Sequence, residues 1–154
     1  MPKTSGLIAA LAVALLAAPL AADDGTKHVD ELIAHGETQL AQQDIDGAIT
    51  TLARAVASDP GSTLAHTRLG GAYLLGGRYT DAIGQFQQAI GIDPTNAGAF
   101  IGMGMAYLHG GQTARAKAAF NEAKRLAPDK AADIDDLIRR IEQDTAATKP
   151  HDRP

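Results

Sequence analysis

The chain has 154 residues, of which 45% are apolar, so it can bury a hydrophobic core within one domain. Its formal net charge is −4, it contains no cysteine, and only 4% of its residues are aromatic. The lack of cysteine excludes disulfides, thiolate zinc sites and cysteine nucleophiles. The acidic balance and the scarcity of aromatic rings argue against a nucleic-acid partner.

The first 22 residues have the layout of a secretory signal peptide. Lys3 provides a positive start, a long uncharged run rich in leucine and alanine follows, and small residues precede an acidic pair. We expect cleavage after Ala22, or alternatively after Ala21, and therefore a periplasmic or secreted protein. The other interpretation is a retained anchor, but Pro19 interrupts the run before the roughly 20 apolar residues that a spanning helix needs. Because no cysteine follows the run, a bacterial lipoprotein is excluded. A secreted domain without disulfides suits a bacterial periplasm.

The rest of the chain repeats itself at a fixed step. Pro60, Pro94 and Pro128 are each 34 residues apart, which gives a period of 34 residues. Four further columns keep the same phase: Gly36, Gly70 and Gly104; Ala48, Ala82 and Ala116; Ala55, Ala89 and Ala123; and Leu52, Phe86 and Phe120. Five columns in phase over three copies indicate a repeat architecture.

Each copy is predicted to form two helices. We expect them at 29–42 and 46–58, at 63–76 and 80–91, and at 97–110 and 114–126, after a lead segment at 23–28. The glycine and alanine columns let neighbouring helices approach closely. Each proline ends a second helix, and the pairs Gly76-Gly77 and Gly110-Gly111 suit a left-handed turn after a first helix.

A seventh helix is predicted at 131–144. Its apolar residues stand at i, i+3, i+4 and i+7 and form one stripe, made of Ile134, Leu137, Ile138 and Ile141. Such a helix covers the core of the last repeat and keeps a polar outer face, as the end of a repeat array requires. Residues 145–154 contain two prolines and no apolar period, so we expect a disordered tail there.

This pattern resembles the tetratricopeptide repeat (TPR) family. The copy at 63–96 matches the signature of the family at Leu69, Gly70, Tyr73, Ala82, Phe86, Ala89 and Pro94. The copy at 97–130 also fits, whereas the copy at 29–62 is degenerate because His35 and Gln39 depart from the pattern. The resemblance implies an all-α, right-handed helical solenoid of three antiparallel helix pairs with a capping helix.

Catalytic, cofactor and metal sites are not expected. The glycines match neither nucleotide-binding pattern, and the five histidines include no pair with metal-ligand spacing. The few serines lack the nucleophile-elbow motif. We therefore predict that the protein is not an enzyme and uses no cofactor or metal.

The resemblance also implies a concave groove for a peptide, lined by the second, fifth, ninth, twelfth and thirteenth positions of each first helix. In this chain these positions are Asp30, Ile33, Glu37, Leu40 and Ala41, then Leu64, Thr67, Gly71, Leu74 and Leu75, then Gly98, Ile101, Met105, Leu108 and His109. The set is largely apolar, and contiguous apolar surface marks interaction sites. The alternative is that the three leucines at the twelfth position pack within the array or under the capping helix.

One class of partner is not expected. Repeats that capture acidic chaperone C-termini hold lysine, asparagine and arginine along this groove to bind carboxylates. The matching places here hold Ile33, Glu37, Gly71, Gly98 and Gly102. A carboxylate clamp is therefore absent.

The function predicted from the sequence is a non-catalytic adaptor of the bacterial cell envelope that binds an apolar or amphipathic peptide segment. The expected partner is a protein or peptide, with no nucleic acid and no membrane insertion after signal cleavage. Two alternatives remain: a self-associating array that forms homo-oligomers through the degenerate first repeat, and an accessory subunit of an envelope enzyme.

Overall fold

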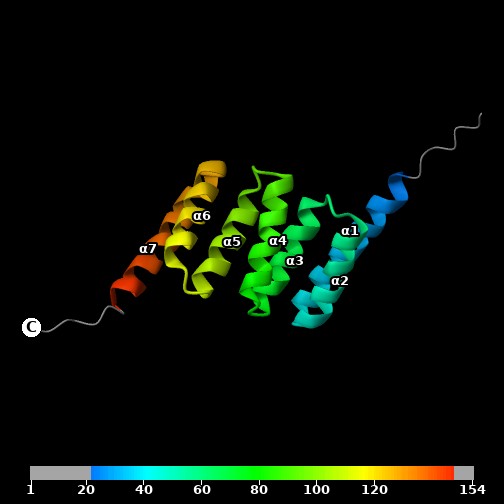
Figure 1. The fold of residues 1–154 in the computed structure, drawn as a ribbon, viewed down its shortest axis with the longest axis horizontal. Coiled ribbons are helices and arrows are strands. Elements are labelled where there is room, and N and C mark those ends of the chain that lie inside the picture. The colour runs from blue at the N-terminus through cyan, green and yellow to red at the C-terminus, as the bar shows by residue number, and fades with distance from the viewer. Residues whose placement is uncertain (1–21, 148–154) are drawn as a thin grey trace, which may run out of the picture.

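The computed structural model describes residues 22–147. Its α-helices are α1 (Ala22–Ala41), α2 (Ile45–Ser58), α3 (Thr63–Leu75), α4 (Tyr79–Ile92), α5 (Ala97–His109), α6 (Thr113–Leu126) and α7 (Ala131–Ala147), with a 3-10 turn, η1 (Pro128–Lys130), before α7. The helices stand side by side in chain order from α1 at one end to α7 at the other (Figure 1). Antiparallel pairs of this kind, repeated along one direction, form an all-α solenoid.

The predicted boundaries of α2 to α6 agree with the structure to within one residue at each end. The prediction for the first helix was wrong, because α1 begins at Ala22 and includes the expected lead segment 23–28. That segment contains no proline, and lengthening an existing helix adds one hydrogen bond per ordered residue. Residues 145–147, expected in the tail, are the last residues of α7. The expected signal peptide and the rest of the tail lie outside the described residues, except Ala22.

The turn after each first helix has the same left-handed form in all three repeats. Gly77 and Gly111 have φ of 71° and 74°, and Gln43, which is their counterpart in the first repeat, has φ of 64°. In the second repeat the Gly77 amide donates to Leu74 (3.1 Å) and the Arg78 amide donates to Tyr73 (2.8 Å). This bonding pattern satisfies the last helical carbonyls. The first repeat forms it with a glutamine, although glycine adopts this conformation at lower cost.

Side-chain caps set where the helices that follow begin. Asp44, Ser62 and Asn96 each accept a hydrogen bond from the backbone amide three residues later, at 3.0, 3.1 and 2.9 Å. These bonds satisfy amides that have no partner within the helix. The prolines at 60, 94 and 128 come two residues after the ends of α2, α4 and α6, as predicted.

The glycine column and the large apolar column contact each other within every repeat. A Cβ on Gly36 would lie 2.6 Å from Cγ of Leu52, and one on Gly70 would lie 2.8 Å from Cε1 of Phe86. The third repeat shows the same relationship between Gly104 and Phe120, at 2.6 Å. The large side chains fill the space between helices because the opposite backbone carries no side chain there. All six alanines of the two alanine columns are fully buried.

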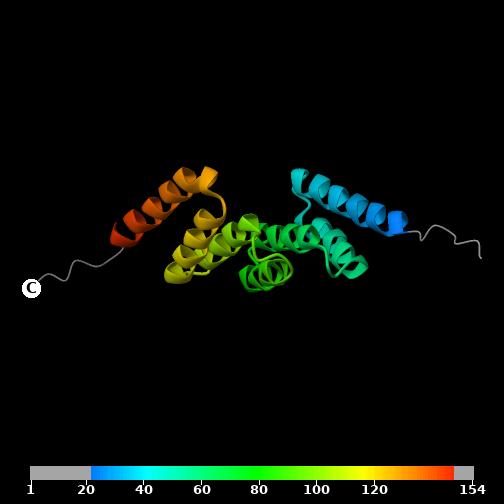
Figure 2. The ribbon, with the colours of Figure 1, turned by 90° about the horizontal axis from the view of Figure 1, so that it is seen from above.

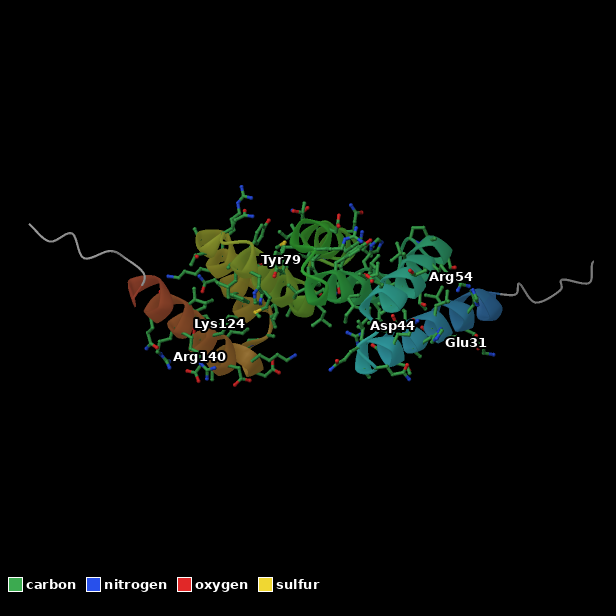
Figure 3. The ribbon with its side chains drawn as sticks, turned by 90° about the horizontal axis from the view of Figure 1, so that it is seen from below. Glu31, Asp44, Arg54, Tyr79, Lys124 and Arg140 are labelled. Atoms are coloured by element: carbon green, nitrogen blue, oxygen red, sulfur yellow. The ribbon has the colours of Figure 1, made fainter. Side chains whose placement is uncertain are left out.

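The two ends of the array bury their apolar stripes and expose polar faces. In α7, Ile134 and Ile141 are buried against a cluster that contains Phe120. Two ion pairs join α6 to α7: Lys117 to Glu142 at 2.6 Å and Lys124 to Asp135 at 2.7 Å. At the other end, Val29 and Leu32 of α1 are buried in the core. Figure 3 shows Glu31 and Arg54 at the α1–α2 end and Lys124 and Arg140 at the α6–α7 end.

Candidate functional site: the concave face

The array is concave on one side. Seen from above, α1 and α7 rise toward the same side at the two ends, and the helices between them lie lower (Figure 2). Because the repeats have a fixed period, residues one period apart occupy equivalent points on neighbouring first helices. Three of the predicted groove positions form such rows, which we call the concave rows: Asp30, Leu64 and Gly98; Glu37, Gly71 and Met105; and Ala41, Leu75 and His109.

Helix α3 carries the most exposed apolar residues of this face. Leu64 is 45% exposed and Leu75 is 65% exposed. They are eleven residues apart, which places them on one side of the helix with about 16 Å between them along its axis. Gly71 lies between them, and a Cβ at that position would meet no atom within 4 Å. The surface of α3 is therefore apolar at both ends and open in the middle.

Not every predicted groove residue reaches this surface. Ile33 is only 5% exposed and belongs to the core cluster shared by α1, α2 and α3. Because Ile33 is buried in this cluster, the prediction that it lines the groove was wrong. Leu40 and Leu74 are half-buried and pack against core clusters as well. For these two leucines the structure favours the packing alternative.

The predicted apolar groove residues of α5 pack against the core cluster at the C-terminal end of the array. Ile101, Met105 and Leu108 are half-buried and pack against the cluster to which α6 and α7 contribute. Part of each side chain remains accessible. Core packing therefore takes a share of the apolar surface that α5 contributes, and α3 contributes the more exposed part.

Polar contacts join the first helices across the concave face. Arg68 of α3 donates to the carboxylate of Glu37 on α1. Between α3 and α5, the Asn96 side chain donates to Oγ1 of Thr67 at 3.1 Å while it also caps α5. Thr67 and Glu37 thus hold neighbouring helices together. Both residues were predicted for the site, but these contacts were not.

His109 is held at the edge of the face. Its ring stacks on Tyr79 of α4, with 5.6 Å between ring centroids and 16° between ring planes. The contact joins the end of α5 to the start of α4, one repeat earlier. His109 is exposed, but one face of its ring is already occupied by the tyrosine.

Sequence reasoning missed Arg68, the one arginine of α3, which contains no lysine. It sits one position after Thr67, outside the five positions taken for the groove. The sequence carries no clear signal for its contact with Glu37, because the two residues are 31 positions apart and lie on different helices. Gly102 was expected at a groove position that matches a carboxylate clamp. A Cβ there would lie 2.5 Å from Cε1 of Phe86, so Gly102 belongs to helix packing and not to the groove.

A second hollow lies between α5 and α6, outside the three rows. It is lined by Phe100, Met103, Tyr107, Arg115, Ala118 and Ala119. At the corresponding place in the second repeat, Nδ1 of His66 lies 2.8 Å from Oε1 of Gln85. The shorter side chain of Ala119, which replaces Gln85, leaves this space open in the third repeat.

Within residues 22–147, no group of histidine and acidic side chains could hold a metal ion. His66 is buried and bonded to Gln85, and its Nε2 lies 3.1 Å from the carbonyl oxygen of Pro60. No helix in the same part of the chain is long and apolar enough to cross a membrane.

Known proteins share both the sequence pattern and the fold. A tetratricopeptide repeat family model matches residues 33–97, and a second matches residues 73–141, so the two together run from 33 to 141. No curated protein is close enough in sequence to count as a relative.

Three solved structures illustrate the likeness of fold. The TPR domain of Sgt2 from Aspergillus fumigatus is 18% identical, with a TM-score of 0.74, and the match covers 82% of this chain and 84% of that one. The second TPR domain of human RPAP3, in complex with an HSP70 peptide, is 23% identical, with a TM-score of 0.69 over 77% of this chain and 98% of that one. The Yersinia enterocolitica type III secretion translocator chaperone SycD is 15% identical, with a TM-score of 0.72 over 77% and 95%. The chain belongs to the tetratricopeptide repeat family.

Proposed function

We propose that the protein is a non-catalytic adaptor that binds an apolar or amphipathic peptide segment of another protein on its concave face. The observation that carries this proposal is the surface of α3, where Leu64 and Leu75 are exposed on either side of Gly71. In the described part of the chain only one other large apolar residue, Ile92, is comparably exposed. Exposed apolar residues grouped on one face are typical of an interaction site.

The energetics favour this face. Burying a leucine side chain stabilises a complex by about 1.5–3 kcal/mol, and two leucines on one helix can be covered by one segment. The glycine between them lets the main chain of a ligand approach closely. Since Met105 is accessible at the neighbouring helix, a ligand over α3 also gains an adaptable apolar contact.

Solved structures of the same fold support a peptide as ligand. The human RPAP3 domain is in complex with the HSP70 peptide SGPTIEEVD, and SycD is a translocator chaperone. The ligand of this chain differs from that peptide, whose end is acidic, because no lysine lines the three concave rows and Arg68 is already paired with Glu37. An apolar segment fits the rows better.

The proposal includes a location in the bacterial cell envelope. Support comes from the first 22 residues, with their positive start, apolar run and small residues before Asp23. A protein exported in this way meets its partner in the periplasm or outside the cell. The absence of cysteine from the whole chain is compatible with such a place.

A capture experiment tests the function. Gly71→Trp fills the open centre of α3, and Gly84→Trp is the matched control, because a Cβ on Gly84 of α4 would also meet no atom within 4 Å. Envelope proteins captured by the mature chain and by the Gly84 variant, and lost with the Gly71 variant, are the expected ligands. Identical capture by all three chains would contradict the groove as the site, and Ala118→Trp would then test the hollow between α5 and α6.

A further inference from the structure

We infer that the segment bound on the concave face is amphipathic and basic on one flank, with its lysine or arginine side chains toward α1 and its apolar side chains on α3 and α5. This inference rests on the proposed function and names the chemistry of the partner. Two of the three rows carry it, because each begins with a carboxylate on α1, Asp30 or Glu37, and ends with an uncharged residue on α5.

The wall formed by α1 is acidic. Its first two row positions are Asp30 and Glu37, and both side chains are exposed. Glu37 already accepts a hydrogen bond from Arg68, so its charge is partly balanced. Among the side chains that the structure describes, at residues 25–143, Asp30 has no ion-pair or hydrogen-bond partner. Asp30 is therefore the carboxylate on this face that is open to a cation of the ligand.

The opposite wall, formed by α5, carries no carboxylate. Helix α5 contains no aspartate, glutamate, lysine or arginine, and its first two row positions are Gly98 and Met105. Between the walls, α3 presents Leu64 and Leu75, and its single charged residue is the paired Arg68. A segment lying along α3 thus meets carboxylates on one flank and apolar groups beneath it and on the other flank. Charge complementarity selects a cationic flank, because an anionic one would be repelled by α1.

The test uses three synthetic helical peptides, each about five turns long, that share one leucine and alanine face. They differ only on one flank, which carries two lysines, two glutamines or two glutamates. We expect the lysine peptide to bind the mature chain about fivefold more tightly than the glutamine peptide, as for partly exposed ion pairs, and the glutamate peptide to bind most weakly. The difference should shrink at high salt, because exposed charges are screened.

Two variants of the protein locate the effect. Asp30→Asn removes the unpaired carboxylate without breaking an ion pair, and should reduce the preference for lysine over glutamine to less than about twofold. Asp46→Asn, on α2 and outside the three rows, makes the same change of charge and should leave the preference intact. Glu37 is avoided because changing it also breaks the contact with Arg68.

The outcomes separate the two proposals. Equal binding of the lysine and glutamine peptides, or tighter binding of the glutamate peptide, would overturn this inference and leave the apolar groove standing. An equal loss of preference in the Asp30 and Asp46 variants would show a general effect of net charge and overturn the assignment to α1. If none of the three peptides binds, or if Gly71→Trp changes the binding of none, the proposed function itself is contradicted.

Discussion

The ring of Phe86 on α4 lies directly against Gly102 of α5, the first helix of the next repeat. A Cβ on Gly102 would come within 2.5 Å of Cε1 of this ring, and one on Gly70 of α3 would come within 2.8 Å of the same atom. Phe86 therefore occupies a space bounded by two glycines from successive repeats. The ring joins one helix pair to the next, and the stability of the array depends on both glycines.

Gly102→Ala should destabilise the protein by about 1–3 kcal/mol, because the ring must move out of a well-packed position. Gly84→Ala is the matched control, since its Cβ would point into open space. That variant should be more stable by about 0.5–1 kcal/mol, the gain that alanine has over glycine within a helix. Urea unfolding followed by circular dichroism measures both changes. Equal stability of the two variants would contradict the packing described for Phe86.

Gln43→Gly should stabilise the protein by about 0.5–1 kcal/mol. Gln43 has φ of 64°, a conformation that glycine adopts without the steric cost paid by other residues. The reverse change in the third repeat, Gly111→Gln, should destabilise by a similar amount, since Gly111 has φ of 74°. Thermal unfolding of the two variants checks the pair, and a lower melting temperature for Gln43→Gly would contradict the left-handed turn in the first repeat.

Ile134→Ala should lower the free energy of unfolding by about 2–4 kcal/mol, because it leaves a cavity between α7 and the last repeat. Arg139→Ala on the same helix should change the free energy of unfolding by less than about 1 kcal/mol, since the ion pair of Arg139 with Asp136 is exposed.

Removal of residues 131–154 should cause a loss of soluble monomer, which size-exclusion chromatography measures. A truncated chain that stays monomeric and folded would show that the cap is dispensable.

Export from a Gram-negative host should remove the first 22 residues. The apolar run after Lys3 provides the signal, and Ala22 provides the small residue at the cut. The intact mass of the protein recovered from the periplasm measures the site of cleavage. Full-length protein retained in the membrane fraction would instead support the anchor interpretation.

Much of the fold could be predicted from the sequence because its repeated columns record packing directly. Gly70 with Phe86 and Gly104 with Phe120 are spaced as the structure pairs them, and the prolines end the helices where expected. The start of α1 could not be predicted in the same way. Nothing repeats before residue 29, and the residues at 23–28 are compatible with either a helix or a loop.

The site was less accessible to sequence reasoning. Whether a residue at the fifth position is exposed depends on the packing around it: Ile33 is buried in a core cluster, whereas Thr67 is only half-buried. The contact between Arg68 and Glu37 depends on how α1 and α3 lie together, which the spacing of the two residues does not reveal. The left-handed Gln43 was predictable in principle, because it stands one period before Gly77, but glutamine by itself gives no signal for such a turn.

The most direct test of the concave face is the binding of a captured partner segment, measured by calorimetry, to Leu64→Glu and Ile92→Glu variants of the protein. The two residues are 45% and 43% exposed, and only Leu64 belongs to the concave rows. Leu64→Glu should weaken binding by about 1–3 kcal/mol, since a carboxylate would be desolvated against an apolar ligand, and Ile92→Glu should leave the Kd unchanged. A partner that binds the Leu64 variant as tightly as the wild type, and loses affinity for the Ile92 variant, would place the site on another face and contradict the account.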